Sequence, residues 1–502
     1  MKEDDDIEYD VDKNDDRTVS YYNNKDNDDN IITNTKNNNL SFINENRINS
    51  KKKISFINDV MHIMFLGVGA SSLSIVKVPY NISIILTIIF IILIKICNIY
   101  FSYFPLIDII DETKKKHKRS ILNKNEGNAK EKKKEIVKEK KEEIAKEKEK
   151  ERRAKIYKDL CKQLNAFNIP FFIGEIIIHQ VLFYRSLGGI VNIIGEFNYD
   201  SLFMFLSDTY WKDLSMKFVV NIIICLLLIC PIYLKMDAKT IDSFPKIGFY
   251  IILFIVLGVF FQFFYYFINY CKTEFNYRDL RLYPNKTECI PKIFQSLAIF
   301  FYCYSGHNGF FNQIPMEEEL KKPEIRRKEF MRANILNMLI YFVFSCLGFL
   351  SVPTDVVDIV TEKKRFWNKD IIMTISRILL LPFCLFKIII NFDKLKTIVI
   401  GNKEKINKIR NFIFVCAIFS ITCACASLYQ NIVVYITLIG GFFVPIPTFL
   451  IPQIYWRKYI EKGPICDLIN WRIILGIILW FFGIAGSILG IIDIFEGEFN
   501  LY

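Results

Sequence analysis

An apolar segment near the start of the sequence is interrupted by small and polar residues, which are able to expose backbone groups to a ligand. The interruption consists of Gly67, Gly69, Ala70, Ser71 and Ser72. Glycine weakens a helix by about 1 kcal/mol relative to alanine. A break here would free backbone N–H groups at the start of a second half-helix, an end that suits a carboxylate. A small-residue face that packs against another helix explains the same pattern, and this segment alone does not decide between the two.

A second apolar segment has a similar interruption, at Tyr304, Ser305, Gly306 and His307. Two interrupted segments, each at the start of a group of five apolar segments, are typical of transporters built from inverted repeats, whose binding site lies near the membrane midplane. The pairing therefore favours the functional interpretation of both interruptions over the packing interpretation.

Ionisable residues inside apolar segments are costly, by roughly 3 kcal/mol for a central lysine or arginine. Glu175 and His179 are four residues apart and share a helix face, so they could relay a proton, although a structural hydrogen-bonded pair is the simpler interpretation. Arg377 must face protein or water, either as a gate or in a structural ion pair, and His307 is a further candidate for coupling or gating. Lys77 and Lys95 are long enough to snorkel and are assigned no role.

The elements that position these residues are apolar helices. Hydrophobic residues make up 52% of the 502 residues and gather in blocks of about twenty, the length needed to cross an apolar core about 30 Å thick. We therefore expect an all-α integral membrane protein with about eleven spans, the first and sixth broken. They lie at about 59–80, 82–106, 168–194, 216–234, 246–268, 291–312, 332–352, 370–391, 409–428, 431–452 and 470–492.

The polar parts of the chain separate these spans into groups. Residues 1–53 are rich in Asn, Asp and Lys and are expected to be a disordered cytoplasmic tail. Spans 1 and 2 occupy residues 58–110, and spans 3–11 occupy residues 165–495. Between them, the charged insert at 111–160 alternates Lys and Glu, which predicts a solvated cytoplasmic helix without the apolar seam of a coiled coil.

The formal net charge of +12 follows from membrane orientation. With the N-terminus in the cytoplasm, the short inner loops carry more Lys and Arg than the outer loops, so no nucleic-acid partner is implied. The same orientation places Cys271, Cys289 and the sequon at Asn285 in one outer loop, where glycosylation is feasible. The two cysteines either form a disulfide there or stay free.

Signatures of soluble enzymes are missing from the sequence. It has no phosphate-binding loop of the GxxxxGK[ST] type, no zinc-type Cys/His spacing and no dinucleotide fingerprint, and its four histidines are scattered. The sequence therefore predicts a non-enzymatic protein with no cofactor and no metal site.

Five motifs in order resemble the amino acid/auxin permease family. They are Gly67–Tyr80, Leu228–Pro245, the sixth span through Leu320, Arg377 in the eighth span, and Leu438–Pro452 in the tenth. The resemblance implies a five-plus-five inverted-repeat fold and coupled transport of amino acids. It also implies that the first break holds the substrate carboxylate, and that Tyr304, Ser305 and Gly306 hold its amine through backbone carbonyls.

The resemblance leaves the coupling ion and the role open at several points. Sodium-coupled relatives use a span 8 hydroxyl as an ion ligand, and residues 377–387 offer none, which favours H⁺ over Na⁺. The principal alternatives are a sensor that binds an amino acid without transporting it, and a carrier of a polyamine, peptide or cationic drug. Both the plasma membrane and an acidic vacuolar or lysosome-like membrane suit the sequence, and no partner protein is indicated.

Replacing Gly69 with leucine is expected to abolish substrate binding while membrane insertion stays normal, because a bulky side chain would block the approach of the backbone to a carboxylate. The measurement is equilibrium binding of labelled substrate to the purified variant. Wild-type affinity in Gly69→Leu would refute the assignment of the first break.

Overall fold

The computed structural model describes residues 60–109 (without 62, 66 and 69), 132–197, 214–283 (without 274), 289–305, 323–362 (without 352, 355 and 356), 370–400, 408–461 and 470–499. The chain divides into residues 1–56 and 57–502, and every described residue belongs to the second part. The predicted tail, the first half of the charged insert, Gly69, Asn285, Gly306 and His307 lie outside the described residues. So do the side chains of Ala70, Ser71 and Cys289.

Within the described residues, all regular structure is helical. The α-helices are α2 (Ala70–Ser74), α3 (Val78–Ile82), α4 (Ile84–Asn98), α6 (Lys132–Phe197), α8 (Leu214–Ile224), α9 (Cys230–Lys235), α10 (Ala238–Thr273), α11 (Cys289–Cys303), α13 (Pro323–Phe342), α14 (Gly348–Ser351), α15 (Ile371–Ile400), α16 (Lys408–Leu428), α17 (Ile432–Phe442), α18 (Ile451–Trp456) and α19 (Trp471–Phe499). Short 3₁₀ or π-helical turns, such as η1 (Ile75–Lys77) and η5 (Val360–Glu362), join or follow several of them.

Nine helices among the described residues are long and apolar enough to cross a membrane. They correspond to nine of the eleven predicted spans, and the exceptions are the first and the sixth. The first is divided into short pieces on either side of Val68, and the sixth contains the shorter apolar helix Ile290–Cys303. The all-α membrane fold is therefore confirmed, and the difference in number comes from the two interrupted spans.

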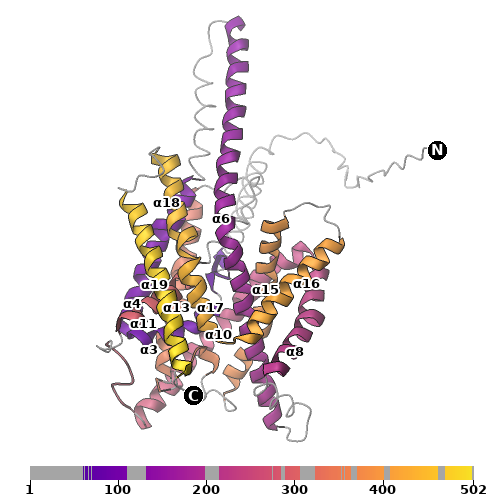
Figure 1. The fold of residues 1–502 in the computed structure, drawn as a ribbon. Helices are drawn as coiled ribbons and strands as arrows, with labels where there is room; N and C mark the ends of the chain where they lie inside the picture. Colours follow the sequence, from indigo (N-terminus) through magenta and orange to yellow (C-terminus); the bar gives the residue numbers. More distant parts are fainter. Residues whose placement is uncertain are drawn as a thin grey trace, which may run out of the picture. The chain divides into compact units, whose positions relative to one another are not determined.

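The helices pack into a bundle in which α6 and α15 form the most extensive contact (Figure 1). A second group contains α11, α17 and α19, each of which packs against the other two. Helix α10 also packs against α15, and α16 packs against α6 and α8. Since α6 and α15 carry Glu175, His179 and Arg377, the largest helix contact joins elements that hold three of the predicted site residues.

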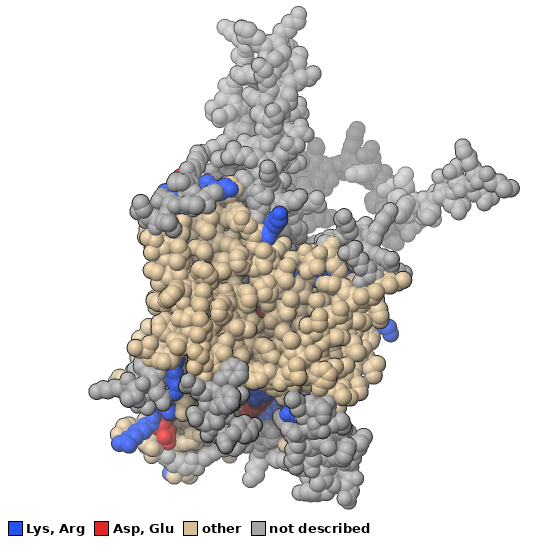
Figure 2. Space-filling model, in the orientation of Figure 1, with Lys and Arg blue, Asp and Glu red and all other residues tan. Residues whose placement is uncertain are grey.

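The outer surface of the bundle is apolar. Figure 2 shows a broad band of uncharged residues on one face, with Lys and Arg gathered towards its two ends. On α10, the exposed residues Leu257, Phe261 and Tyr265 follow at intervals of four, while Ile255 and Val259 are buried. Spacing of four residues places side chains on one helix face. Helix α10 therefore presents one apolar face to the bundle and another to the lipid.

Helix α6 is the longest helix described. It contains 66 residues and joins the second half of the charged insert to the third predicted span without a break in the helix (Figure 1). At 1.5 Å per residue it is about 99 Å long, far more than a bilayer core requires. The helix that carries Glu175 and His179 therefore continues into the polar insert.

Glycines allow α19 and α17 to approach α11 closely. A Cβ atom added to Gly486 would lie 2.1 Å from the backbone oxygen of Phe294, and one added to Gly440 would lie 2.1 Å from that of Ala298. Backbone atoms at that distance cannot move aside without moving a helix. Small residues thus set the spacing within this group of helices.

Gly486→Ala is expected to destabilise the protein by about 1–3 kcal/mol, because the new methyl group would overpack the contact between α19 and α11. A matched control is Gly189→Ala, since a Cβ atom at Gly189 meets nothing within 4 Å. The control should be neutral or more stable by up to about 1 kcal/mol. Thermal unfolding of both purified variants measures the difference, and equal melting temperatures would contradict the packing argument.

Candidate functional site

The first predicted span is interrupted at the expected place. Its helix reaches Gly67, Val68 is not helical, and α2 begins at Ala70. The last four carbonyls of a helix have no partner within it. Two carbonyls near this end accept hydrogen bonds from side chains of other helices: the Phe65 oxygen from the Lys387 ammonium, and the Gly67 oxygen from the Tyr341 hydroxyl at 2.6 Å. The break is thus held by donors from α15 and α13.

The sixth predicted span ends its helix at Cys303, and Tyr304 and Ser305 form a turn. The Ser305 hydroxyl donates to the Tyr302 oxygen at 2.6 Å, and the Asn98 amide donates to the Tyr304 oxygen at 2.6 Å. The oxygen of Cys303 lies within hydrogen-bond distance of the Tyr341 hydroxyl. One side chain of α13 therefore contacts the ends of both interrupted helices.

The Tyr304 side chain organises the second interruption. Its hydroxyl donates to the Ile91 oxygen at 3.1 Å, and its ring lies 5.1 Å from the ring of Tyr341. The Lys95 ammonium lies 4.5 Å from the centre of the Tyr304 ring, and Lys95 is buried. The expectation that Lys95 snorkels is therefore wrong, because the face of an aromatic ring provides an attractive site for the ammonium inside the bundle.

A buried cluster of charged and polar groups lies where α6 meets α15. The His179 Nδ1 atom lies 2.7 Å from the Glu175 backbone oxygen and 3.4 Å from its carboxylate, and the Asn391 amide donates to that carboxylate at 3.3 Å. The Lys387 ammonium interacts electrostatically with Glu175 while it donates to Phe65. The predicted pair of Glu175 and His179 is thus connected to the first interruption through Lys387.

Lys394 adds a second buried ammonium to this cluster. It lies about two helical turns beyond Lys387 on α15 and 5.8 Å from the centre of the Phe172 ring. Its Nζ atom has no hydrogen-bond partner among the described residues, and it interacts electrostatically with Lys387 and Glu175. Glu175 and Asp393 both act on Lys394 as charges of opposite sign, so two lysines and two carboxylates interact in this part of the protein.

Helix α13 presents a row of polar groups to the first interruption. Asn334, Asn337 and Tyr341 share one helix face, and all three are buried. A Cβ atom added to Gly67 would lie 2.6 Å from the Asn337 amide nitrogen, so a larger residue would require the Asn337 side chain to move. In the described part of the chain, neither side-chain polar atom of Asn334 has a hydrogen-bond partner. Buried polar groups of this kind are available to a ligand or to water.

The segment from Asp358 to Glu362 contacts three of the predicted spans. Asp358 forms an ion pair with Lys77 at 3.0 Å, and Glu362 forms one with Arg185. The Thr361 backbone oxygen accepts a hydrogen bond from Arg377 Nε at 2.7 Å. These contacts connect the segment to three different spans. Partly exposed ion pairs are each worth about 1 kcal/mol or less. Two partly exposed ion pairs and one buried hydrogen bond from Arg377 therefore hold the segment against these spans.

The Glu362 carboxyl of this segment has a shifted pKa. Burial raises the pKa of the Glu362 carboxyl above its ordinary value of 4.5, and the neighbouring Arg185 acts in the opposite direction. Burial thus disfavours the charged form of Glu362, and the ion pair with Arg185 favours it.

A comparison with known protein families shows which family this chain belongs to. A family model described as transmembrane amino acid transporter protein matches residues 135–495, well over half of the chain. The chain belongs to this family. The match begins after the first two predicted spans, so the motif at Gly67–Tyr80 lies outside it. No curated protein matches the chain.

The structure of this amino acid transporter brings some predicted site residues together and separates others. Gly67, Tyr304 and Ser305 lie at the two interruptions. Ser72 is buried in α2, close behind the first one. Arg377 lies apart from them and donates to the Thr361 oxygen in the segment from Asp358 to Glu362. Cys271 is exposed near the end of α10, and the predicted disulfide with Cys289 stays a prediction.

Several residues at the two interruptions and in the interior cluster were not predicted. They are Asn98, Tyr341, Lys387, Asn391 and Lys394. Both lysines interrupt the apolar run of α15. Lys394 lies beyond residue 391, where the eighth span was expected to end, whereas Lys387 lies inside that span and its charge was a signal in the sequence. Neutral Asn and Tyr side chains give no such signal, because their role depends on which backbone atoms they meet.

Tyr341→Phe is expected to weaken substrate binding by about 5- to 150-fold, because it removes the hydroxyl that contacts both interrupted helices at a cost of about 1–3 kcal/mol. Binding of labelled substrate to the purified variant measures the loss. A suitable control is Tyr250→Phe, on an exposed position of α10. Equal affinity of both variants and the wild type would refute this role of Tyr341.

Proposed function

We propose that this chain is a secondary active transporter that carries amino acids by alternating access and couples their movement to protons. The observation that supports this most directly is the pair of interrupted helices, whose backbone ends meet at Tyr341 in the middle of an apolar bundle. Irregular backbone at membrane depth is tolerated where it lines a cavity or lies buried in protein, and paired breaks are typical of transporter binding sites. Membership of an amino acid transporter family supports the substrate class.

The substrate would lie between the two interruptions. Its carboxylate would be held by backbone N–H groups at Gly69, Ala70, Ser71 and Ser72, where the second half of the first span begins, and its ammonium by carbonyl oxygens near Tyr304, Ser305 and Gly306. Helix starts favour anions and helix ends favour cations. The Tyr304 oxygen already accepts from Asn98, yet a carbonyl has two lone pairs and can accept a second donor.

Lys387 supports protons as the coupling ion. Its ammonium binds the Phe65 oxygen at the carbonyl end of the first half-helix, where the helix dipole attracts a cation. A cation that is part of the chain supplies this charge without a bound metal ion. Loss of its proton would leave a neutral amine that donates more weakly to the Phe65 oxygen, and it would remove the positive charge that interacts with Glu175. Proton movement would thus be linked to the geometry of the first span.

The proposed membrane orientation has the N-terminus in the cytoplasm. The segment from Asp358 to Glu362 then closes the outer end of the bundle, with Arg377 holding it and thus acting at a gate. The loop that contains Asn285, Cys271 and Cys289 lies on the same side, which would allow a glycan and a disulfide. Alternating access would require the outer contacts to open in turn.

Labelled amino acids should enter proteoliposomes that contain the purified protein, and an inward pH gradient should stimulate saturable uptake. Lys387→Gln keeps a donor for the Phe65 oxygen but removes the charge, so it should lose most of the stimulation by the gradient while exchange of substrate without a gradient continues. Lys272→Gln, at an exposed position of α10, is the control.

Stimulation by the gradient in Lys387→Gln equal to that in the wild type would exclude Lys387 from coupling. Uptake that requires Na⁺ would contradict proton coupling. If folded wild-type protein transported no amino acid in a mixed panel, the sensor or a carrier of another solute would become the better interpretation. The sensor has one structural feature in its favour, because α6 links the interior cluster directly to the charged insert.

A further inference from the structure

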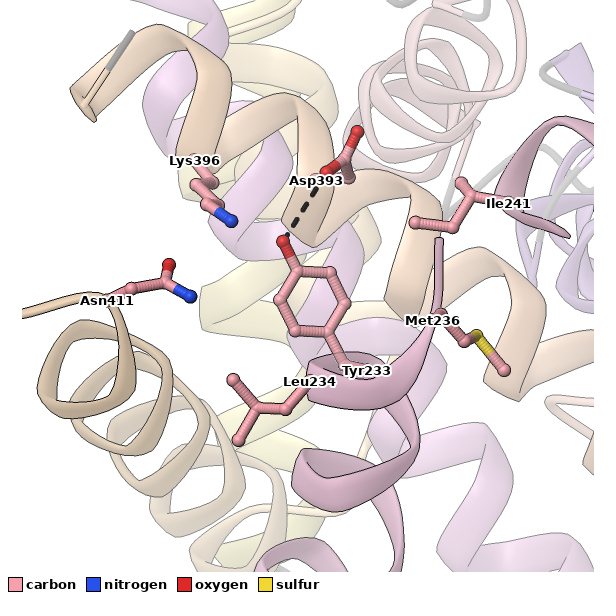
Figure 3. A pocket seen from close by; sticks show the side chains of 7 residues that line it. All are labelled: Tyr233, Leu234, Met236, Ile241, Asp393, Lys396 and Asn411. Carbon is pink, nitrogen blue, oxygen red and sulfur yellow. Dashed lines mark hydrogen bonds between the residues drawn. The ribbon is translucent and has the colours of Figure 1, made fainter. Parts of the chain in front are cut away.

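A cavity separate from the two interruptions lies where α9, α10, α15 and α16 come together (Figure 3). Its volume is about 260 Å³, and the residues that line it are Tyr233, Leu234, Met236, Ile241, Asp393, Lys396 and Asn411. One water occupies about 30 Å³ in the liquid, so the cavity has room for a small solute. In the orientation proposed above, the cavity faces the cytoplasm.

The wall of this cavity carries one acidic and one basic side chain, Asp393 and Lys396. The Tyr233 hydroxyl donates to the Asp393 carboxylate at 3.4 Å, and the Lys396 ammonium lies 5.6 Å from the centre of the Tyr233 ring. Asp393 and Lys396 are three residues apart on α15 and share a face, with an axial separation of about 4.5 Å.

A further polar group points into the same space from α16. Lys396 and Asn411 extend towards the Tyr233 ring from opposite helices (Figure 3). The Asn411 side-chain oxygen is buried and has no hydrogen-bond partner in the described part of the chain. The remaining wall consists of Leu234, Met236 and Ile241, which are apolar. The cavity therefore combines a carboxylate, an ammonium, an amide and an apolar wall.

We infer that this cavity is a second amino acid site, on the cytoplasmic side of the transporter; the inference rests on the proposed function. The ligand's ammonium would lie between the Asp393 carboxylate and the face of the Tyr233 ring, which attract a cation. Its carboxylate would accept hydrogen bonds from the Lys396 ammonium and from the Asn411 amide nitrogen, which points towards Tyr233 (Figure 3). Its side chain would contact Leu234, Met236 and Ile241. Each charged group of an α-amino acid thus meets a group of opposite charge.

A ligand bound here would restrain helices that transport requires to move. The cavity spans the short link at Met236 and Asp237, which joins α9 to α10, and it contacts the end of α15. Lys396 lies about 7.5 Å along α15 from Asn391, which contacts Glu175 in the interior cluster. Occupation by cytoplasmic amino acid would therefore hold α9 against α15 and slow the transport cycle.

The test is equilibrium binding of the amino acid identified in the uptake panel to purified full-length protein in detergent. The wild type should bind two molecules per chain. Lys396→Gln should retain one, with affinity at the other site weakened at least tenfold, and Lys396→Arg should restore the second. Gly69→Leu should also retain one, and the double variant Gly69→Leu with Lys396→Gln should bind none. Lys272→Gln, an exposed lysine, should bind two, and thermal unfolding should show that all variants are folded.

The failure of this inference can be distinguished from failure of the proposed function. If the wild type bound one molecule, Gly69→Leu abolished that binding and Lys396→Gln left it intact, the central site would stand and the second site would be refuted. If one molecule was bound and only Lys396→Gln abolished it, the cavity would be supported and the central assignment would fail. Phosphatidylethanolamine carries the same ammonium and an anionic phosphate. Displacement of the second amino acid by this lipid at equimolar concentration would assign the cavity to a lipid headgroup and overturn the inference.

Discussion

A backbone polar group inside an apolar membrane core must find a partner within the protein, since no water is available to it. This constraint explains the arrangement around the two interrupted helices. Each interruption exposes carbonyl groups that a continuous helix would satisfy, and side chains from three other helices bind them: Lys387 from α15, Tyr341 from α13 and Asn98 from α4. The donors that allow the helices to break also hold the broken ends in register with each other.

The charged groups of the interior follow from the same constraint. An isolated ammonium in an apolar medium is costly, and removing one member of a buried pair costs about 3–5 kcal/mol. Lys387 has a carbonyl and Glu175 near it, and Lys95 has the face of Tyr304. Lys394 lies near the Phe172 ring and interacts electrostatically with Glu175. Because these groups lie on helices that meet the interruptions, a change in charge at one of them acts directly on the geometry of the site.

The sequence was sufficient to predict the membrane fold and the two interruptions, since both depend on composition along a single segment. Blocks of apolar residues define the spans. A run of small and polar residues, such as the one that begins at Gly67, weakens a helix whatever surrounds it. The partners of the broken ends could not be predicted in this way. Tyr341 and Asn98 are neutral residues in apolar helices, and their function depends on the rotation of α13 and α4 about their axes. The burial of the Lys95 ammonium likewise depends on the ring of Tyr304, a residue more than 200 positions away in the sequence.

The Tyr341 hydroxyl carries one proton but has two carbonyl oxygens within reach, one on each interrupted helix. A phenol can donate that proton to one acceptor at a time or share it unequally between both. When the first span moves away from the sixth, the hydroxyl can turn from one oxygen to the other, so that one hydrogen bond replaces a nearly equivalent one. When the two spans move relative to each other, the number of hydrogen bonds made by the Tyr341 hydroxyl then stays the same, and the two bonds are of nearly equal energy. The two positions of the first span relative to the sixth can therefore differ little in free energy, although a hydrogen bond holds the span in each of them.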